Sequence, residues 1–317
     1  MHLIDRGAGV VLRFLGDHER VFRDGWGDSD LLSHIDLARV TPPAAIEIEW
    51  DMPRRSDRLV LTNGRFVSPV KCLPEAARQA QVRLVKPSKA ARRVCVLLPA
   101  WNDEGYATRM RLAKRLAAAG VASILLEAAF YGQRRVDRTG SPIRTVSDFA
   151  LLSRSVVDEG RAIVSHLVEQ GRLAGVSGYS MGGSLAAVVA ATVEVPLAVT
   201  LLAASYSPHV VFLHGVLRDA VAWKALEPGG RERLADVLET GSVLSVPPSP
   251  ATRRAVIVAA RGDGFVPAES SLAIHHHWPG SEMQWVNGGH ASLLWTRPGV
   301  LAEAMVHGFD RATWGST

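Results

Sequence analysis

The feature that most constrains how this sequence folds is a series of continuous apolar runs that begins after residue 92. These runs lack alternation of apolar and polar residues, which is typical of strands buried on both faces of a parallel sheet. Stretches with helical periodicity separate them, and this repeated strand–helix alternation predicts a doubly wound α/β sheet. The runs are VCVLLPA (94–100), VASILLEA (121–128), LAGVSGY (173–179), LAVTLLAA (197–204), AVIVAA (255–260) and the weaker EMQWV (282–286).

Two of the intervening helices have recognisable ends. The segment 108–120 closes on Gly120, a residue type that suits the left-handed position after a helix. A longer helix is predicted to begin at a Ser147 N-cap and to stop at Gly171. The segment 205–250 then interrupts the alternation with an amphipathic stretch (209–226) and a proline-rich one, which predicts a small helical cap.

The first part of the chain has a different character. Short alternating runs at 45–50, 58–69 and 80–86 predict antiparallel strands, and the pair Asn63-Gly64 within the second predicts a tight turn. Residues 1–44 are amphipathic and end at TPP. The sequence therefore predicts an N-terminal helical extension over 1–44, followed by one α/β domain over 45–317 that carries the cap.

The composition narrows the class of protein. Of the 317 residues, 47% are hydrophobic and 21% charged, the balance of an ordinary soluble globule. The net charge of +5 comes from dispersed residues without a basic stripe, which disfavours nucleic-acid binding. Cys72 and Cys95 could form one disulfide at most. With no signal peptide and no apolar run of about 18 residues, we expect a cytoplasmic chain without a transmembrane segment.

The stretch VSGYSMGGSLAAVVAA (176–191) surrounds Ser180 with glycines. A GxSxG match alone is weak evidence, and the alternative is an inert serine at a glycine-rich corner. Here, however, Ser180 falls where a buried strand meets a helix, which is the context of a nucleophile elbow. Gly178 and Gly182 leave room for the sharp turn. The helix N-terminus also directs N–H groups at the hydroxyl, which favours an oxyanion there.

A serine hydroxyl needs a base, and two later loops supply candidates. Asp263 follows the run AVIVAA, and His290 follows EMQWV within the glycine loop NGGH. Both lie after strand ends, at the edge where open α/β sheets build their sites. Alternatives are a turn-forming Asp-Gly and an ordinary loop histidine. The run His275 to His277 has no metal-ligand spacing, so we expect neither a metal nor a cofactor.

An oxyanion intermediate requires two N–H donors. We expect one from the backbone of Met181 and the other from Trp101, with Ala100 as the alternative, in the loop LLPAWNDEGY (97–106). Phe130 and Tyr131 follow another strand at the same edge and, with Ala100, are candidates to line an acyl pocket. Asn102, Asp103 and Glu104 either support the site or cap a helix, and capping is slightly favoured.

With these motifs in order, the chain resembles the α/β-hydrolase superfamily, and within it the α/β-hydrolase domain-containing protein 18-like group. The resemblance rests on ASILLEAAFYGQRR, RTVSDFALL, GYSMGGSLAA, DGFVP and WPGSEMQWVNGGHASLLW, and it covers roughly residues 45–312. It implies the α/β-hydrolase fold and a triad of Ser180, Asp263 and His290. Where such relatives have a glycine-rich oxyanion loop, this sequence has PAWNDEG.

The function predicted from these residues is hydrolysis of a carboxylic ester through an acyl-enzyme on Ser180. Apolar cap residues suggest a small-molecule substrate with an acyl or other hydrophobic part. Two kinds of alternative stay open. One is a hydrolase fold that only binds a ligand or protein, and the other is acyl transfer, thioester cleavage or peptide cleavage by the same triad. The sequence does not determine the length of the acyl group or the oligomeric state.

Overall fold

The computed structural model describes residues 1–13, 15–36, 39, 41–56 and 58–313. Over these residues the centre is a ten-stranded sheet in the order β1-β3-β4-β6-β5-β7-β8-β9-β10, with β2 paired to β3. The six strands from β5 onward pair parallel to one another, and β1 to β4 pair antiparallel. The strands are β1 (Glu49–Trp50), β2 (Arg54–Ser56), β3 (Leu59–Val67), β4 (Gln79–Pro87), β5 (Arg93–Leu98), β6 (Ala122–Leu126), β7 (Leu173–Tyr179), β8 (Ala198–Leu202), β9 (Val256–Ala260) and β10 (Glu282–Val286).

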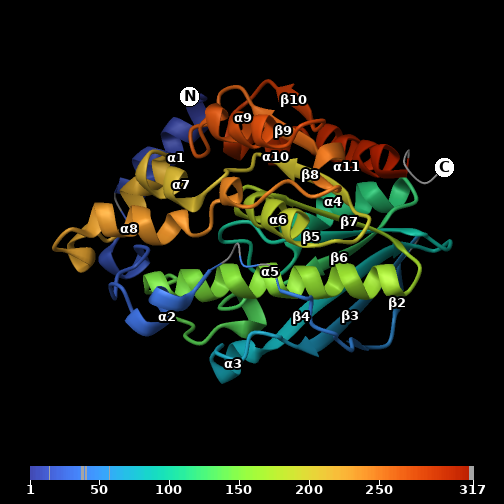
Figure 1. The fold of residues 1–317 in the computed structure, drawn as a ribbon, viewed down its shortest axis with the longest axis horizontal. Helices are drawn as coiled ribbons and strands as arrows, with labels where there is room; N and C mark the ends of the chain where they lie inside the picture. Colours follow the sequence, from blue (N-terminus) through green and yellow to red (C-terminus); the bar gives the residue numbers. More distant parts are fainter. Residues whose placement is uncertain (14, 37–38, 40, 57, 314–317) are drawn as a thin grey trace.

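Helices cover both faces of this sheet (Figure 1). One core lies between the sheet and α5 and α6, and the other between the sheet and α4 and α11. The α-helices, with short 3₁₀ turns as η, are α1 (Leu3–Arg13), η1 (Asp17–Glu19), α2 (Ser29–His34), α3 (Glu75–Arg78), α4 (Ala107–Ala118), η2 (Gly132–Arg134), α5 (Val146–Glu169), α6 (Met181–Thr192), α7 (Pro208–Leu213), η3 (Val216–Ala220), η4 (Trp223–Leu226), α8 (Gly230–Glu239), η5 (Val243–Ser245), η6 (Thr252–Arg254), α9 (Ala268–His277), α10 (His290–Thr296) and α11 (Pro298–Thr313). The predicted mostly parallel, doubly wound sheet with antiparallel N-terminal strands is confirmed.

Asn63 and Gly64 do not form the predicted turn. They lie inside β3, where Gly64 pairs with Trp50 on one side and Val82 on the other. A Cβ atom at position 64 would sit 2.6 Å from Cε3 of the Trp50 ring. The glycine therefore admits a neighbouring indole into a continuous strand, a requirement that the two-residue motif does not reveal.

The long helix α5 begins earlier than predicted, because its N-cap is Thr145 and not Ser147. Oγ1 of Thr145 accepts a hydrogen bond from the Asp148 N–H at 3.0 Å. The Asp148 carboxylate in turn accepts from the Thr145 N–H at 2.9 Å. This reciprocal capping box satisfies two backbone donors, whereas a Ser147 cap would satisfy one.

The amphipathic stretch 209–226 of the cap is not the single helix that its pattern predicts. It divides into α7, η3 and η4. The break falls at Gly215, where a Cβ would lie 2.2 Å from the Phe265 carbonyl oxygen. The cap thus approaches the loop after β9 too closely for a continuous helix carrying side chains.

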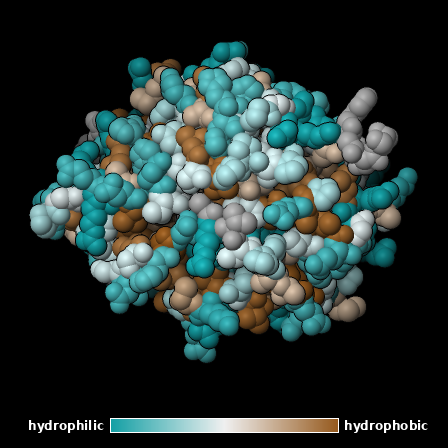
Figure 2. Space-filling model, in the orientation of Figure 1, coloured by the Kyte–Doolittle hydropathy of each residue, from teal (hydrophilic) through white to brown (hydrophobic). Residues whose placement is uncertain are grey.

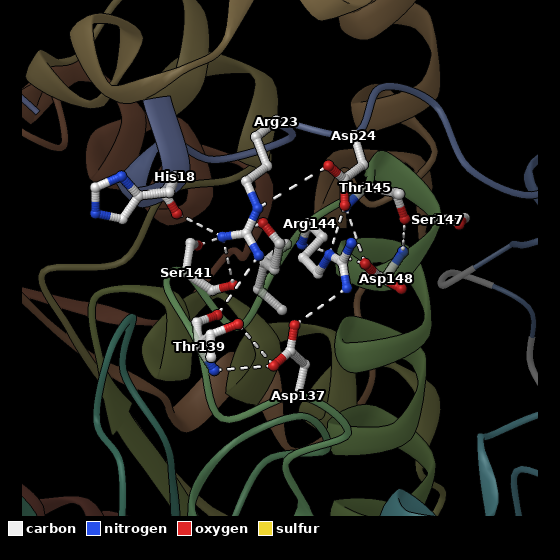
Figure 3. A network of polar contacts seen from close by, with 11 residues as sticks. His18, Arg23, Asp24, Asp137, Thr139, Ser141, Arg144, Thr145, Ser147 and Asp148 are labelled. Carbon is white, nitrogen blue, oxygen red and sulfur yellow. Dashed lines mark hydrogen bonds and ion pairs between the residues drawn. The ribbon is translucent and has the colours of Figure 1, made fainter. Parts of the chain in front are cut away.

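The N-terminal segment is bound to the body of the molecule at several points. Val21 forms an isolated parallel bridge with Val221 of the cap. Figure 3 shows the polar contacts nearby, in which the Arg144 guanidinium lies between the carboxylates of Asp24 and Asp137. Arg23 donates to the backbone carbonyls of Thr139 and Ser141, in the loop that also contains Asp137. These contacts hold residues 18–24 against the loop that precedes α5.

Helix α1 exposes most of its apolar side chains to solvent, whereas Leu12 packs against the core. Leu3 is 79% exposed, and Ile4, Val10 and Val11 are also exposed. Asp5 on the opposite side is fully buried. Elsewhere, hydrophilic side chains cover much of the face in Figure 2, with apolar ones between them. Within the described part of the chain, no helix has the length and apolar character needed to cross a membrane.

A buried ion pair joins the loop after β6 to α5. Arg134 and Glu159 form two hydrogen bonds, at 2.8 and 2.6 Å, and both side chains are almost wholly excluded from water. Arg134 also donates to the carbonyls of Ala77 and Glu127. Its donors are therefore satisfied only while the carboxylate and both carbonyls stay in place.

Replacing Glu159 with Ala should therefore lower the free energy of unfolding by about 3–5 kcal/mol, because the buried guanidinium would lose its counter-charge. Chemical denaturation measures this loss. Glu169→Ala, an exposed change on the same helix, should stay within about 0.5 kcal/mol of the wild type. Equal losses in the two variants would contradict the assignment of a buried, dependent pair.

Candidate active site

Ser180 stands at a sharp turn between β7 and α6. Its backbone has φ 55° and ψ −121°, a conformation that costs a non-glycine residue roughly 1–3 kcal/mol. The Ser180 N–H donates to the Leu202 carbonyl at 2.9 Å, which fixes the turn to β8. A Cβ at Gly178 would lie 2.4 Å from the backbone of Gly182. The strained turn is possible because the residues on both sides lack side chains.

Gly182 also brings α6 against the end of β5. A Cβ there would lie 2.5 Å from the Leu98 carbonyl oxygen and 2.8 Å from that of Pro99. The first turn of α6 therefore abuts the loop that carries Trp101. This contact sets the amides of Met181 and Trp101 on neighbouring segments, as an oxyanion site requires.

Asp263 and His290, which are 27 residues apart, meet at the same edge of the sheet. Oδ2 of Asp263 lies 2.7 Å from Nδ1 of His290. Oδ1 of the same carboxylate accepts from the N–H groups of Phe265 and Val266, at 2.9 and 2.8 Å. A carboxylate partner assigns the proton to Nδ1 and leaves Nε2 as the acceptor. The pair thus has the arrangement of a base and its orienting acid.

Two aromatic residues hold the His290 ring. Phe265 stacks on it with ring centroids 5.0 Å apart, and the Tyr179 ring lies 5.1 Å away at a tilt. The Tyr179 hydroxyl donates to the His290 carbonyl. Burial, followed by the nearby carboxylates of Asp263 and Asp5, raises the pKa of Tyr179 well above its usual value. The hydroxyl therefore stays protonated and keeps this donor role.

Ser180 and His290 are both described, and among the described residues no hydrogen bond joins the Ser180 hydroxyl to the His290 ring. Tyr179, adjacent to Ser180, is nonetheless hydrogen-bonded to the backbone of His290, which ties the two loops together. Contacts of this kind are commonly loose in ligand-free enzymes and tighten when substrate binds. The structure thus brings the side chains of Asp263 and His290 into contact, but it contains no hydrogen bond between the His290 ring and the Ser180 hydroxyl.

The N–H groups of Met181 and Trp101 have no hydrogen-bond acceptor among the described residues. The next amide in the loop, that of Asn102, is occupied by the Tyr131 hydroxyl at 3.3 Å. Tyr131 is fully buried and supports this loop from behind. It therefore helps to position the candidate donor at Trp101 and does not line a pocket.

A small apolar cavity of about 40 Å³ lies beside Ser180. Its wall is formed by Trp101, Phe149, Ser153, Met181, Ser184, Leu185, Pro208, Val211, Phe212, Leu217 and Val266. The rings of Trp101, Phe149 and Phe212 pack on one another with centroids 5.3 to 6.0 Å apart. Neither Phe130 nor Tyr131 borders this cavity, and Ala100 borders a separate one. None of the three residues predicted to line an acyl pocket therefore borders the cavity beside Ser180.

Asn102, Asp103 and Glu104 do not cap a helix, because the N-cap of α4 is Tyr106 and no side chain caps this helix. Asp103 instead forms a buried ion pair with Arg109 at 2.6 Å. Glu104 pairs with Arg135 at 2.7 Å, across the candidate oxyanion loop. The buried charges of Asp103 and Arg109 need each other as partners, whereas Glu104 is exposed. Together the two pairs fix the shape of the loop.

The remaining histidines make ordinary contacts. His275 lies 2.9 Å from the Ser281 hydroxyl, and His277 lies 2.7 Å from the Val246 carbonyl. In the part of the chain that the structure describes, no three His, Cys, Asp or Glu side chains gather as metal ligands would. Both cysteines are free, and burial raises the pKa of the Cys95 thiol.

Sequence reasoning missed one residue of the site. The carboxylate of Asp5, on α1, accepts hydrogen bonds from the backbone of both loops that carry Asp263 and His290. The only local signal was the amphipathic pattern of residues 1–44, which gives no reason to turn an aspartate inward.

Solved structures with the same architecture include several esterases. Acetyl xylan esterase 1 from Thermoanaerobacterium sp. JW/SL YS485 has a TM-score of 0.60 at 12% identity, over 93% of this chain and 97% of that one. The acetyl xylan esterase from Paenibacillus sp. R4 has a TM-score of 0.60 at 12% identity, over 88% and 95%. An S-formylglutathione hydrolase from Agrobacterium tumefaciens has 0.56 at 10%, over 83% and 99%.

The topology and these likenesses define an α/β-hydrolase fold. Within that class, the family model described as alpha/beta hydrolase domain containing 18 matches residues 19–241 and 230–311. The chain belongs to this family, as the resemblance of its motifs indicated. Helix α1 lies outside the matched residues.

The contact between Gly182 and the end of β5 leads to a test. Gly182→Ala should lower the free energy of unfolding by about 1–3 kcal/mol, because the added methyl group would push α6 off the loop. Gly299→Ala is the control, since a Cβ there meets nothing closer than 3.7 Å. Denaturant melts that show no difference between the two variants would contradict the close packing described here.

Proposed function

We propose that this chain is a serine hydrolase that cleaves a carboxylic ester through an acyl-enzyme on Ser180. The observation that carries the proposal is the 2.7 Å contact between Asp263 and His290 beside the strained turn at Ser180. A structural serine at a corner has no need of a strained backbone or of an oriented imidazole nearby.

In the proposed reaction, Nε2 of His290 takes the Ser180 proton as the hydroxyl attacks the ester carbonyl. Asp263 keeps the imidazole in the correct tautomer and stabilises the imidazolium that forms. The imidazolium then gives its proton to the leaving alcohol, and the acyl group stays on Ser180. A water molecule, activated by His290, releases the acid and restores the serine.

The tetrahedral intermediate in each half of the reaction carries a negative oxygen. The N–H groups of Met181 and Trp101 are the proposed donors to it, supported by the positive end of α6. Removing one such donor typically costs about 2.7–4 kcal/mol of transition-state stabilisation. Both donors belong to the backbone, so the absence of the glycine-rich loop found in relatives does not remove them.

The cavity beside Ser180 supports a short acyl group. Its volume of about 40 Å³ is a few times the ~10–15 Å³ needed to hold one water molecule. The rings of Phe149 and Phe212 are part of its wall. Two of the similar solved structures are acetyl esterases by name, which agrees with a small acyl group but at 12% identity does not assign one.

A fluorophosphonate probe tests the nucleophile directly. The wild type should be labelled, because the probe reacts with an activated serine, and Ser180→Ala should abolish labelling. Ser184→Ala is the matched control, since this hydroxyl also borders the cavity and hydrogen-bonds the Ser180 carbonyl. Intact-mass spectrometry measures the adduct.

Folded wild type that takes up no probe would reject the proposal and favour a hydrolase fold that only binds a ligand or protein. Labelling that survives Ser180→Ala would move the nucleophile elsewhere. Product partition with and without an added alcohol separates hydrolysis from acyl transfer.

A series of nitrophenyl esters tests the size of the acyl pocket. The wild type should prefer acetyl and butyryl esters, because longer chains collide with the aromatic wall. Phe212→Ala should raise kcat/KM for octanoyl esters relative to acetyl by about tenfold, which corresponds to roughly 1.4 kcal/mol of differential binding. Val67→Ala, an exposed change on β3, should leave the ratio unchanged. An unchanged ratio in Phe212→Ala as well would place the acyl group elsewhere.

A further inference from the structure

Helix α1 carries a carboxylate that is wholly enclosed by the two loops of the proposed acid and base. Asp5 has no exposed surface, although the helix lies on the outside of the molecule. Oδ2 of Asp5 accepts from the N–H groups of Gly264 and His290, at 2.9 and 2.7 Å. Oδ1 accepts from the Ala291 N–H at 3.0 Å. One side chain therefore bonds to the residue after Asp263 and to His290 itself.

The backbone near Asp5 is shaped to receive the helix. A Cβ at Gly289 would lie 2.4 Å from Cβ of His2 and 2.7 Å from Oδ2 of Asp5. A Cβ at Gly264 would lie 3.0 Å from Cβ of Asp5. The His2 N–H also donates to the Gly262 carbonyl at 2.8 Å. The glycines that flank Asp263 and His290 thus have a physical role, because they admit α1 to contact distance.

Apolar burial explains only part of why α1 docks in this orientation, because Leu12 is the one Leu, Ile or Val side chain of this helix that packs against the core. An amphipathic helix that serves only as an anchor buries its apolar side, yet Leu3, Ile4, Val10 and Val11 face solvent here. Burying a carboxylate costs free energy unless its hydrogen bonds replace those of water. Three charge-assisted N–H bonds supply that compensation, so the docking depends on the contact between Asp5 and the two loops.

We propose that Asp5 is a positioning residue of the active site, which fixes the acid loop and the histidine loop relative to each other. This inference rests on the proposed function for its effect on catalysis. Asp263 and His290 are joined by one side-chain contact, and Asp5 adds a second link through the backbones of the same loops. The Asp263 carboxylate restrains the His290 ring, and the Asp5 carboxylate restrains its backbone.

Loss of the Asp5 side chain should slow the chemical step of the reaction and not substrate binding. Asp5 touches neither the cavity nor the candidate oxyanion donors, so its loss should leave substrate binding nearly intact. Freed loops would let the His290 ring drift from the geometry that proton transfer needs. Misplacement of a reacting group by about 1 Å can cost up to about 100-fold in rate.

The test compares Asp5→Ala and Asp5→Asn in the full chain, with nitrophenyl acetate as substrate. Asp5→Ala should lower kcat by about 10- to 100-fold while KM changes by less than about twofold, because an interaction used in the transition state is lost. Asp5→Asn keeps one acceptor oxygen and the shape of the side chain, so its loss should be smaller. Leu3→Ser, on the exposed side of α1, should behave as the wild type does.

Two further measurements separate positioning from a loss of folding. Leu116→Ala removes a buried side chain near the end of α4, beside the start of β6 and so at the opposite edge of the sheet from these loops. It should lower the melting temperature without lowering kcat at a temperature where it stays folded. Amide hydrogen exchange should show lost protection at Gly264, His290 and Ala291 in Asp5→Ala and at none of them in Leu116→Ala.

The outcomes are distinguishable. Unchanged kcat in Asp5→Ala, or unchanged protection of the three amides, would overturn the inference. Equal losses of kcat in Asp5→Ala and Leu116→Ala would also overturn it, since instability would then explain both. A wild type that neither turns over ester nor reacts with fluorophosphonate would instead reject the proposed function, and the exchange data would still report whether Asp5 holds the loops.

Discussion

The close approach of α6 to the ends of β5 and β7 is the constraint on which the rest of this edge depends. Gly178 and Gly182 allow it, since a Cβ at either position would overlap neighbouring backbone. The approach forces the chain through a left-handed residue at Ser180 and directs the start of α6 toward its hydroxyl. It also places the loop after β5 beside Met181. The positions of the candidate nucleophile and of the candidate oxyanion donors therefore both depend on the packing of α6 against the ends of β5 and β7.

Carboxylates organise the other half of the edge. The loops after β9 and β10 contain glycines and little regular structure, so their backbone N–H groups need acceptors from elsewhere. Asp263 satisfies two of them and Asp5 three. In surroundings of low dielectric constant these bonds are stronger than they would be in water. Two of the amides bonded to Asp5, those of His290 and Ala291, open α10, where the first N–H groups of a helix have no acceptor within the helix. The two carboxylates thus fix the geometry of both chain segments.

Much of this arrangement could be predicted from the sequence, because its signals are local. Continuous apolar runs marked the parallel strands, and the glycines around Ser180 marked the turn. The parts that escaped depend on partners far along the chain. Gly64 is explained only by the ring of Trp50, and Asp5 by amides 285 residues away. Helical periodicity located the amphipathic N-terminus but could not say which side faces inward, and here that side carries Asp5, Gly9 and Leu12.

The placement of α1 affects how this protein should be handled. Trimming a hydrolase to the boundaries of its family is common practice, and here that cut would fall at residue 19. The shortened polypeptide would retain every residue of the sheet and the whole elbow. It would nevertheless lack the Asp5 carboxylate beside His290.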